Sequence, residues 1–277
     1  MPRELLNRGC PLIRTVSATR YVTPLRKGGS LPAIVDGADD GLYVVKFREA
    51  CQGHRALIAE LVAGEIGRAL GLPVPEIVFV DVDPLLARSE EDSEIKRLIV
   101  ASAGTNIGLD YLPGAIAFDI AASRGVDPVL AARIVWFDAF TSNMDRTAKN
   151  TNLMVWHRNL FLIDHGAALY FHHTRGDYRT RAVSPFPQIR DHVLLRIASD
   201  LHMVDAELAA RLAPATLASI VDLIPDSWLG DVEEIGDVAA HRAAYLTYLR
   251  DRVDGRNAFL EEVDRAKRVR FWRFWHR

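Results

Sequence analysis

The stretch from residue 137 to 170, FDAFTSNMDRTAKNTNLMVWHRNLFLIDHGAALY, constrains the fold more than any other part of the sequence. Two apolar runs, LMVW and LFLI, flank a polar HRN turn, a pattern typical of a β-hairpin. Such a hairpin places Asp145 and Asn150 in the loop that enters it and Asp164 at its exit. Oxygen ligands gathered in this way suit Mg²⁺, which binds one or two carboxylates together with substrate phosphates. The stretch therefore predicts a phosphotransfer site.

The composition excludes several other classes of protein. The 277 residues are 49% hydrophobic and 25% charged, which is enough apolar material for one large domain or two lobes. A formal net charge of −2 argues against a protein that mainly coats nucleic acid. Cys10 and Cys51 are too few and too isolated for a disulfide framework or a zinc site. The first residues lack the apolar core of a signal peptide, and no apolar run approaches the roughly 20 residues of a membrane helix, so we expect a cytoplasmic protein.

The N-terminal part is rich in turn signals and β-branched residues. Gly28, Gly29 and Ser30 precede an AIV run, and the turn DGADDG leads into a strand over residues 42–47. This order predicts an antiparallel hairpin with a glycine-bearing loop at one end.

Helical patterns follow, interrupted by further strand and turn signals. Apolar residues at three- and four-residue spacing predict a helix over 55–70 with a single apolar face, and a strand over 76–81 comes after it. Asp127 and Pro128 begin a nearly all-apolar helix, which predicts a buried one. The remaining helices are expected at 191–201, 205–212, 215–224 and 238–269.

This segregation of strands and helices predicts an α+β protein with a cleft between two unlike lobes. The glycine-rich stretch 103–117 is the best candidate for the boundary. We therefore expect a strand-rich N-lobe over residues 1–108, a hinge over 109–113 and a mainly helical C-lobe over 114–277.

Phosphoryl transfer needs a strand lysine for the nucleotide phosphates, a base for the acceptor hydroxyl, and metal ligands. Lys46 lies in the strand YVVKF, where it either faces solvent on the alternate face or turns into the cleft. Glu60 on the following helix could pair with it, although Glu65 competes for this role. The Gly28–Ser30 segment is either a simple turn or a loop that approaches the phosphates, and the Walker signature is absent.

The spacing of the acidic and amide residues carries more information than any one of them. Asp145 and Asn150 are five residues apart, as are the aspartate and asparagine of a kinase catalytic loop. Asp164, His165 and Gly166 follow a strand, where kinases have Asp-Phe-Gly. A single aspartate at such a position is more often a turn or cap residue. The ordered set indicates a kinase-like site.

With these motifs the chain resembles the HipA-like serine/threonine kinases, distant relatives of protein kinases and phosphatidylinositol kinases. The most specific matches are YVVKF, AELVAGEIGRALGLPVPEIVFV, and NMDRTAKNTNL followed by LIDHG, within a likeness that extends from Gly28 to about Ile224. Longer members of the family carry an extra N-terminal subdomain for which this chain has no room.

The resemblance implies an ATP- and Mg²⁺-dependent mechanism. It implies that Lys46 binds nucleotide phosphates and pairs with Glu60, and that Gly28, Gly29 and Ser30 lie near those phosphates. It further implies that Asp145 is the catalytic base and that Asn150 and Asp164 hold Mg²⁺.

Three functions remain open at this point. The first is a kinase that acts on a protein hydroxyl, and the second is a small-molecule or lipid-headgroup kinase of the same fold. The third is a nucleotide-binding pseudokinase or regulatory module. We expect a protein substrate and no stable nucleic-acid binding. The basic aromatic tail over 265–277 either packs on the C-lobe or contacts an acidic partner or membrane surface.

Other polar residues have plainer interpretations. The pair His172 and His173 fits no zinc-ligand spacing, so both are expected to be loop residues. Asp191 and His192 are expected to begin a helix rather than to form a catalytic pair.

Overall fold

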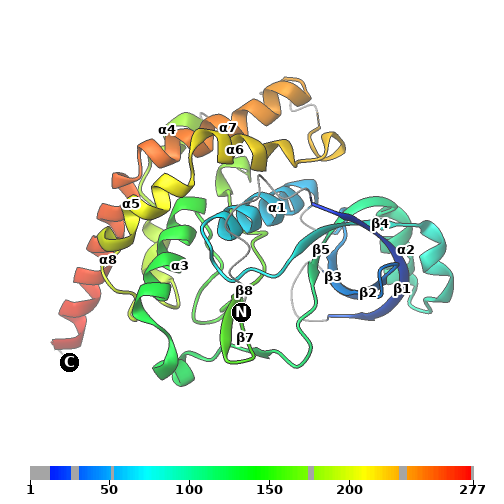
Figure 1. Ribbon diagram of the computed structural model, residues 1–277, viewed down its shortest axis with the longest axis horizontal. Coiled ribbons are helices and arrows are strands. Elements are labelled where there is room, and N and C mark those ends of the chain that lie inside the picture. Colours follow the sequence, from blue (N-terminus) through cyan, green and yellow to red (C-terminus); the bar gives the residue numbers. More distant parts are fainter. Residues whose placement is uncertain (1–12, 26–30, 51–52, 174–177, 231–235, 276–277) are drawn as a thin grey trace.

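The computed structural model in Figure 1 describes residues 13–25, 31–50, 53–173, 178–230 and 236–275. The predicted glycine loop, Gly28 to Ser30, lies outside these residues, as do both cysteines. A barrel of strands, with α2 beside it, occupies one side of the view in Figure 1 and most of the other helices gather on the other side, with α1 between them. The expected mixture of strands followed by helices is confirmed.

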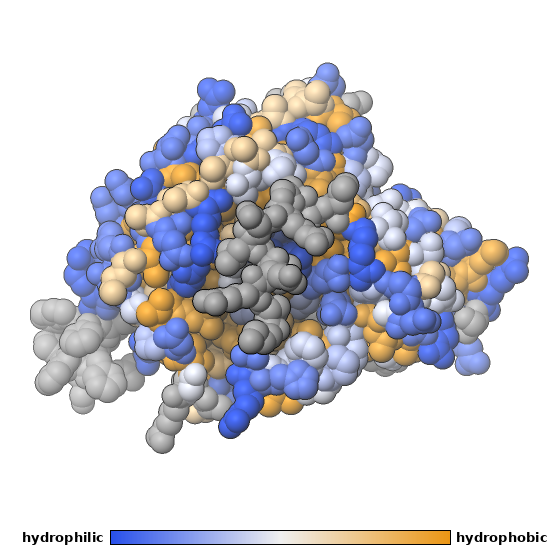
Figure 2. Space-filling view, in the orientation of Figure 1, coloured by the Kyte–Doolittle hydropathy of each residue, from blue (hydrophilic) through white to orange (hydrophobic). Residues whose placement is uncertain are grey.

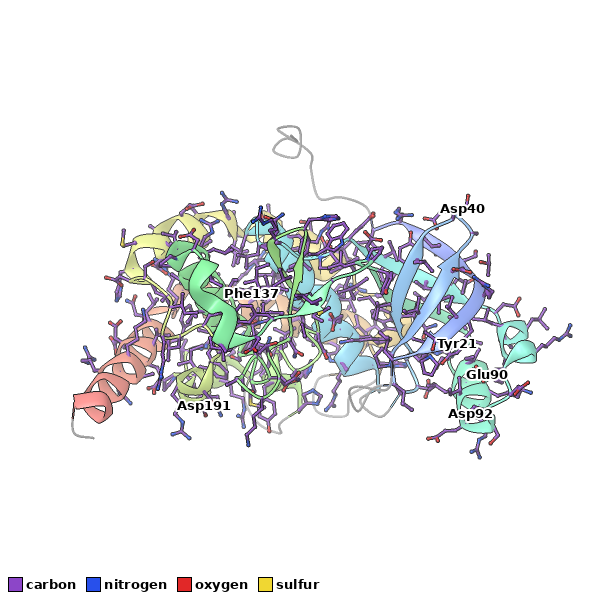
Figure 3. All side chains as sticks on the ribbon, turned by 90° about the horizontal axis from the view of Figure 1, so that it is seen from below. Tyr21, Asp40, Glu90, Asp92, Phe137 and Asp191 are labelled. Atoms are coloured by element: carbon purple, nitrogen blue, oxygen red, sulfur yellow. The ribbon has the colours of Figure 1, made fainter. Side chains whose placement is uncertain are left out.

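The strands of the N-terminal part close into a barrel in the order β1-β2-β3-β5-β4. Their bounds are β1 (Thr15–Pro24), β2 (Ala33–Gly37), β3 (Leu42–Lys46), β4 (Ile77–Val82) and β5 (Gly104–Asp110). The predicted antiparallel hairpin is β2 and β3, with Asp40 at its turn (Figure 3). The sequence predicts β2, β3 and β4 but not β1 or β5, and it does not predict the closure, which arises because β1 pairs antiparallel with β2 and parallel with β4.

The wall of the barrel separates two hydrophobic cores. Neighbouring residues of a strand point to opposite faces, so β4 serves both. Val78, Val80 and Val82 pack inside the barrel, whereas Ile77 and Phe79 pack in the larger core among the helices. The barrel is therefore joined to the helices through the outer face of its own strands.

Helix α1 (Gly53–Ala69) lies between the barrel and the helices, where the sequence predicts a helix over 55–70. The expectation of a single apolar face is wrong, because every residue from Ala56 to Gly67 is buried. The reason is that α1 contacts β4 and β5 on one side and α6 (Pro214–Asp222) on another. Consequently Glu60 and Glu65 are both buried carboxylates.

Helix α3 (Pro128–Thr141) is buried from Ala131 onward except at the half-buried Arg133, as its apolar sequence predicts. Asp127 caps it by accepting hydrogen bonds from the N–H groups of Val129 and Leu130 at 3.1 and 3.3 Å. Phe137, labelled in Figure 3, lies in the larger core.

The predicted hairpin after α3 is present. It consists of β7 (Leu153–Trp156) and β8 (Asn159–Leu162), with β6 (Ile116–Ala117) as a third strand beside β7. His157 and Arg158 form the turn with φ angles of 47° and 67°, the left-handed geometry that matches the twist of a two-residue hairpin loop.

The other helices complete the helical part and the outer edge of the barrel. They are α2 (Ser93–Ala101), α4 (Tyr178–Ala182), α5 (His202–Arg211), α6 (Pro214–Asp222), α7 (Val238–Asp254) and α8 (Asn257–Trp275). Glu90 and Asp92 precede α2 at the outer edge of the barrel (Figure 3). None of the helices within the described ranges has the length and apolar character to cross a membrane. On the face in Figure 2, hydrophilic and hydrophobic side chains are interspersed over both parts of the molecule.

Two predicted helices differ from the structure. The helix expected at 191–201 is absent, because Val193 donates its N–H to the carbonyl of Arg146 at 3.0 Å and residue 192 forms a β-bridge with Thr147. The backbone of this segment is thus bound to the loop after α3. The long helix expected at 238–269 is divided into α7 and α8, because Gly255 caps the end of α7.

Candidate active site

Lys46 ends β3 and points toward α1. The side chain of the neighbouring Val45 packs inside the barrel, so the side chain of Lys46 projects from the opposite face of β3. Its cross-strand partner is Ile107 of β5, whose side chain packs in the larger core. The exposed alternative for Lys46 is excluded, since only 8% of the residue is accessible to solvent.

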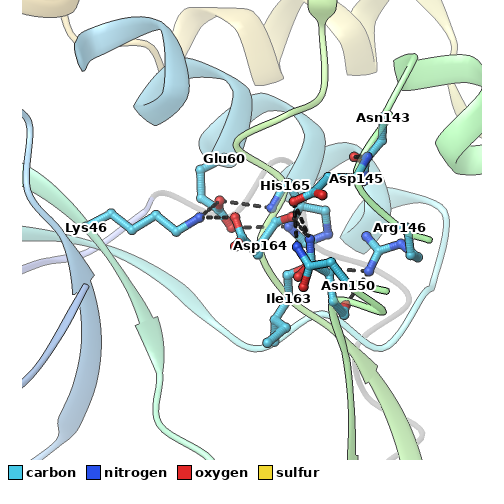
Figure 4. Close-up of polar contacts among 10 residues, drawn as sticks. Lys46, Glu60, Asn143, Asp145, Arg146, Asn150, Ile163, Asp164 and His165 are labelled. Carbon is cyan, nitrogen blue, oxygen red and sulfur yellow. Dashed lines mark hydrogen bonds and ion pairs between the residues drawn. The ribbon is translucent and has the colours of Figure 1, made fainter. Parts of the chain in front are cut away.

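The ammonium group of Lys46 contacts two carboxylates (Figure 4). Its Nζ atom lies 2.5 Å from Oε2 of Glu60 and 2.5 Å from Oδ1 of Asp164. Burial alone would lower the pKa of Lys46, but the two carboxylates more than offset this effect and raise it above its ordinary value. Lys46 is therefore a fixed cation that joins β3, α1 and the exit of the hairpin.

Glu60 is fully buried and has a second partner besides Lys46. The backbone N–H of His165 donates to Oε2 of Glu60 at 2.9 Å, and Nδ1 of His165 lies 3.2 Å from Oε1. Since a carboxylate only accepts hydrogen bonds, Nδ1 carries the proton. Burial alone would raise the pKa of Glu60, yet Lys46 and His165 hold it below its usual range.

Glu65, the competing candidate, lies elsewhere. It pairs with Arg68 at 3.1 Å, and burial raises its pKa. The partner of Lys46 is Glu60.

Asp145 lies in the loop between α3 and β7 and is held from several sides. Its backbone N–H donates to Oδ1 of Asn143 at 3.1 Å. Its Oδ2 atom accepts from the amides of Asn150 at 2.7 Å and Asn152 at 3.2 Å. Burial raises the pKa of Asp145; the hydrogen bond from Asn152 opposes this shift and the charge of Asp164 adds to it. A half-buried carboxylate of raised basicity suits a proton acceptor.

Asp164 and Asn152 stand at the two ends of the hairpin in left-handed backbone conformations, with φ angles of 55° and 46°. Asparagine and aspartate tolerate this region better than other non-glycine residues. The amide of Asn152 also approaches the carbonyl oxygen of Asp164 at 3.4 Å. Because Asn152 precedes β7 and Asp164 follows β8, both residues lie at the open end of the hairpin, next to Asp145.

The donor set at the hairpin fits a hard divalent cation. Asp164 offers a carboxylate whose side chain is 41% exposed, and Asn150 offers an exposed amide oxygen. Within the described ranges, Oδ2 of Asp164 and Oδ1 of Asn150 accept no hydrogen bond from another residue. Oxygen ligands of this number and type match Mg²⁺, which keeps open positions for water and phosphate oxygens.

The structure therefore brings five of the predicted site residues into contact. Lys46, Glu60 and Asp164 are joined by ion pairs, and Asn150 is hydrogen-bonded to Asp145. The remaining predicted residues, Gly28, Gly29 and Ser30, lie outside the described ranges.

Sequence reasoning missed a group of polar side chains behind this site. The group consists of Asp138, Arg146, Asn152 and His192. One signal for it was available: Asp138 is a lone charge within the apolar helix sequence VWFDAF, and such a charge must find a partner once the helix is buried.

The fold belongs to the class of the kinases. The crystal structure of CtkA, a proinflammatory kinase of Helicobacter pylori, matches with a TM-score of 0.51 and 14% sequence identity, covering 92% of this chain and 99% of that chain. The Golgi casein kinase with Mn/ADP bound matches at a TM-score of 0.39 and 11% identity, covering 88% of this chain and 73% of that one. A second structure of the Golgi casein kinase matches with a TM-score of 0.41 and 12% sequence identity, covering 91% of this chain and 72% of that chain.

The chain belongs to the HipA-like kinase family, whose family model matches residues 19–257. It is therefore a kinase, that is, a phosphotransferase. The match extends past Ile224 and includes all of α7, so the likeness is longer than the sequence motifs alone indicate. Comparison with curated protein sequences gave no match.

Proposed function

We propose that this kinase uses ATP and Mg²⁺ to phosphorylate a serine or threonine hydroxyl of a protein substrate. The observation that carries the proposal is the position of Lys46, which contacts Glu60 and Asp164 at once. Lys46 in contact with both the buried Glu60 and the candidate metal ligand Asp164 matches the lysine–glutamate pair and the metal-binding aspartate that protein kinases use in phosphoryl transfer.

The residues divide the work between them. Asp145 accepts the proton of the acceptor hydroxyl as the oxygen–phosphorus bond forms and the bond from phosphorus to the leaving ADP oxygen breaks. Lys46 presents its charge to the nucleotide phosphates. Asn150 and Asp164 would hold Mg²⁺, which supplies electrostatic stabilisation of the charge that develops on the phosphoryl oxygens.

The proposal includes a division into an N-lobe over 1–108, a hinge over 109–113 and a C-lobe over 114–277. The separate core inside the barrel supports it, whereas β5 continues past residue 108 to Asp110. Helix α1 contacts both parts, because its buried residues belong to the larger core while it packs on β4 and β5. Gly28, Gly29 and Ser30, which lie between β1 and β2 in the sequence, are proposed to approach the phosphates.

Transfer of labelled γ-phosphate tests the proposal. Wild type is expected to label protein, and phosphoamino-acid analysis is expected to yield phosphoserine or phosphothreonine. Asp145→Ala should lower the rate by roughly 10²–10⁴-fold, since it removes the general base. Asp164→Ala should abolish transfer, and Asp81→Ala, an exposed carboxylate of β4 outside the site, should leave it unchanged.

Each failure has its own signature. Equal labelling by wild type and Asp145→Ala would contradict the assigned base. Label that appears only in small molecules or lipids would identify the alternative acceptor class. Thermal stabilisation by ATP and Mg²⁺ without any transfer would identify a pseudokinase, because a ligand that binds only the folded form stabilises it without turnover.

A further inference from the structure

Behind the site, one buried guanidinium binds the backbone at both ends of the hairpin. Arg146 follows Asp145 directly, and its side chain is fully buried. Its Nη1 group donates to the carbonyl oxygen of Asn152, which precedes β7, and to that of Ile163, at 3.4 Å, which precedes Asp164. Figure 4 shows Arg146 on the side of the site opposite Lys46.

The charge of Arg146 is neutralised by Asp138 of α3, which has no exposed surface. Nε of Arg146 donates to Oδ2 of Asp138 at 2.6 Å. The other oxygen, Oδ1, accepts from the amide of Asn143 at 2.9 Å. Because Asn143 in turn accepts the backbone N–H of Asp145, the carboxylate of Asp138 is connected to the backbone on both sides of Asp145.

His192 completes the network from a third segment of the chain. Its Nε2 atom lies 2.8 Å from Oδ2 of Asp138, and its Nδ1 atom accepts the backbone N–H of Leu194 at 3.0 Å. An Nδ1 that accepts a hydrogen bond is unprotonated, so the ring is neutral and Nε2 carries the proton. The same segment binds the catalytic loop directly, since the N–H of Val193 donates to the carbonyl of Arg146 at 3.0 Å.

Stability alone does not account for this arrangement. Removing two charges from water costs free energy that a buried ion pair only partly recovers, and apolar residues of similar volume often stabilise a fold as well or better. In addition, Nη2 of Arg146 is a buried donor without a hydrogen-bond partner among the described residues. A role in fixing the geometry of the site would account for a network with these costs.

We propose that Asp138, Arg146 and His192 are positioning residues that hold Asp145 and Asp164 at a fixed separation. The proposal rests on the proposed function, because it assumes that Asp145 and Asp164 act together in phosphoryl transfer. Arg146 is the direct link, Asp138 orients the guanidinium, and His192 orients Asp138. None of the three touches the reacting atoms.

Matched substitutions of His192 separate positioning from simple packing. The amide of glutamine can occupy the place of Nε2 and keep the donor to Asp138, whereas asparagine resembles the Nδ1 side of the ring and loses that donor. His192→Gln is expected to stay within about threefold of the wild-type kcat, and His192→Asn to fall roughly tenfold or more, with KM for ATP nearly unchanged in both. Arg146→Lys keeps the positive charge but loses the planar, forked set of guanidinium donors, and its kcat should fall about 100-fold.

Leu217→Ala in α6 is the control for lost stability, because Leu217 is buried and apolar and has no polar contact with the network. It should lower the Tm without changing kcat by more than about twofold. The positioning role is overturned if Arg146→Lys and His192→Asn keep the wild-type kcat. It is equally overturned if their loss of kcat is no greater than that of Leu217→Ala at the same loss of Tm.

Amide hydrogen exchange gives a second readout that needs no turnover. Arg146→Lys and His192→Asn should raise exchange in both 143–152 and 163–166, whereas Leu217→Ala and His192→Gln should not. Unchanged exchange in either segment would overturn the inference. If wild type shows no phosphoryl transfer, the proposed function fails, and the exchange result still decides whether the network holds the two segments together.

Discussion

Asp138 is a charged side chain without exposed surface, and its partners determine how stability depends on pH. Burial alone would raise its pKa, but Arg146 and His192 lower it to about 2, from an ordinary value of 3.8. A carboxyl whose pKa is lower in the folded state stabilises the fold above its unfolded pKa, and this contribution is lost as the pH falls through the folded pKa. The shift corresponds to about 2 kcal/mol.

We therefore expect the free energy of unfolding to fall between about pH 4 and pH 2, with Asp138 contributing about 2 kcal/mol of the decrease. Urea unfolding of wild type and Asp138→Asn at several pH values measures it. The variant should be less stable at neutral pH and should lose less stability on acidification. A variant whose unfolding free energy falls as steeply as that of wild type would show that Asp138 does not titrate in this window.

At the residue scale, the sequence predicts candidate residues for the chemistry, whose roles stay predictions, and it misses the buried polar side chains behind them. Lys46, Asp145 and Asp164 could be predicted because each stands at a fixed distance along the chain from a strand or turn. Asp138 and His192 are separated by more than 50 residues, and only the tertiary fold brings them within 2.8 Å. Local patterns contain no signal for such a contact.

At the scale of elements, the sequence predicted α1, α3 and the β7–β8 hairpin because capping residues, periodicity and turn residues agree there. For the segment after β8 the sequence predicts only loop residues at His172 and His173, where the structure has a short 3₁₀ helix over Tyr170–His173. Its conformation is set by contacts with α7 rather than by its own periodicity. Phe171 stacks on Tyr248 with ring centres 3.8 Å apart, and Nδ1 of His172 lies 2.9 Å from the hydroxyl of Tyr245.

Arg252 of α7 makes the most extensive of these contacts. It donates to the carbonyls of Ala139 at 2.8 Å and Phe140 at 3.2 Å at the end of α3, and to those of Ala182 at 2.9 Å and Ser184 at 2.6 Å around the end of α4. The carbonyls of Ala139, Phe140 and Ala182 lie in the last turns of α3 and α4, where a helix lacks intrahelical donors, and that of Ala139 also accepts the N–H of Ser142 at 3.4 Å. One buried side chain thus ties the helix before the catalytic loop to the segment after the hairpin.

We expect Arg252→Met to lower the free energy of unfolding by about 3 kcal/mol, because buried carbonyls without partners cost about 1–3 kcal/mol each. Trypsin cleavage at the exposed Arg179 and Arg181 of α4 should accelerate at the same time. Arg242→Met is the matched control, since Arg242 also lies on α7 but donates to the carbonyls of Val221 and Ile224. Equal acceleration of cleavage in both variants would contradict a specific role for Arg252.

At the scale of the whole molecule, the site joins two hydrophobic cores. Lys46 ends a strand whose other face lines the barrel, whereas Glu60 and Asp164 lie on elements of the larger core. The sequence could predict that strands precede helices. It could not predict the barrel or the shared wall, because closure depends on the pairing of β1 with β4, which lie far apart in the chain.

A nucleotide bound at Lys46 contacts this junction, so it should stabilise the whole molecule. At 100 times Kd a ligand specific for the folded state contributes about 2.7 kcal/mol, which raises Tm by about 5–10 °C for a chain of this size. Lys46→Met should start from a lower Tm, because it leaves Glu60 buried without its cation, and should lose most of the shift with ATP and Mg²⁺. Arg20→Met, which removes an exposed cation from β1, should keep the full shift. Thermal unfolding with and without nucleotide measures both, and a full shift in Lys46→Met would show that the nucleotide binds away from the junction.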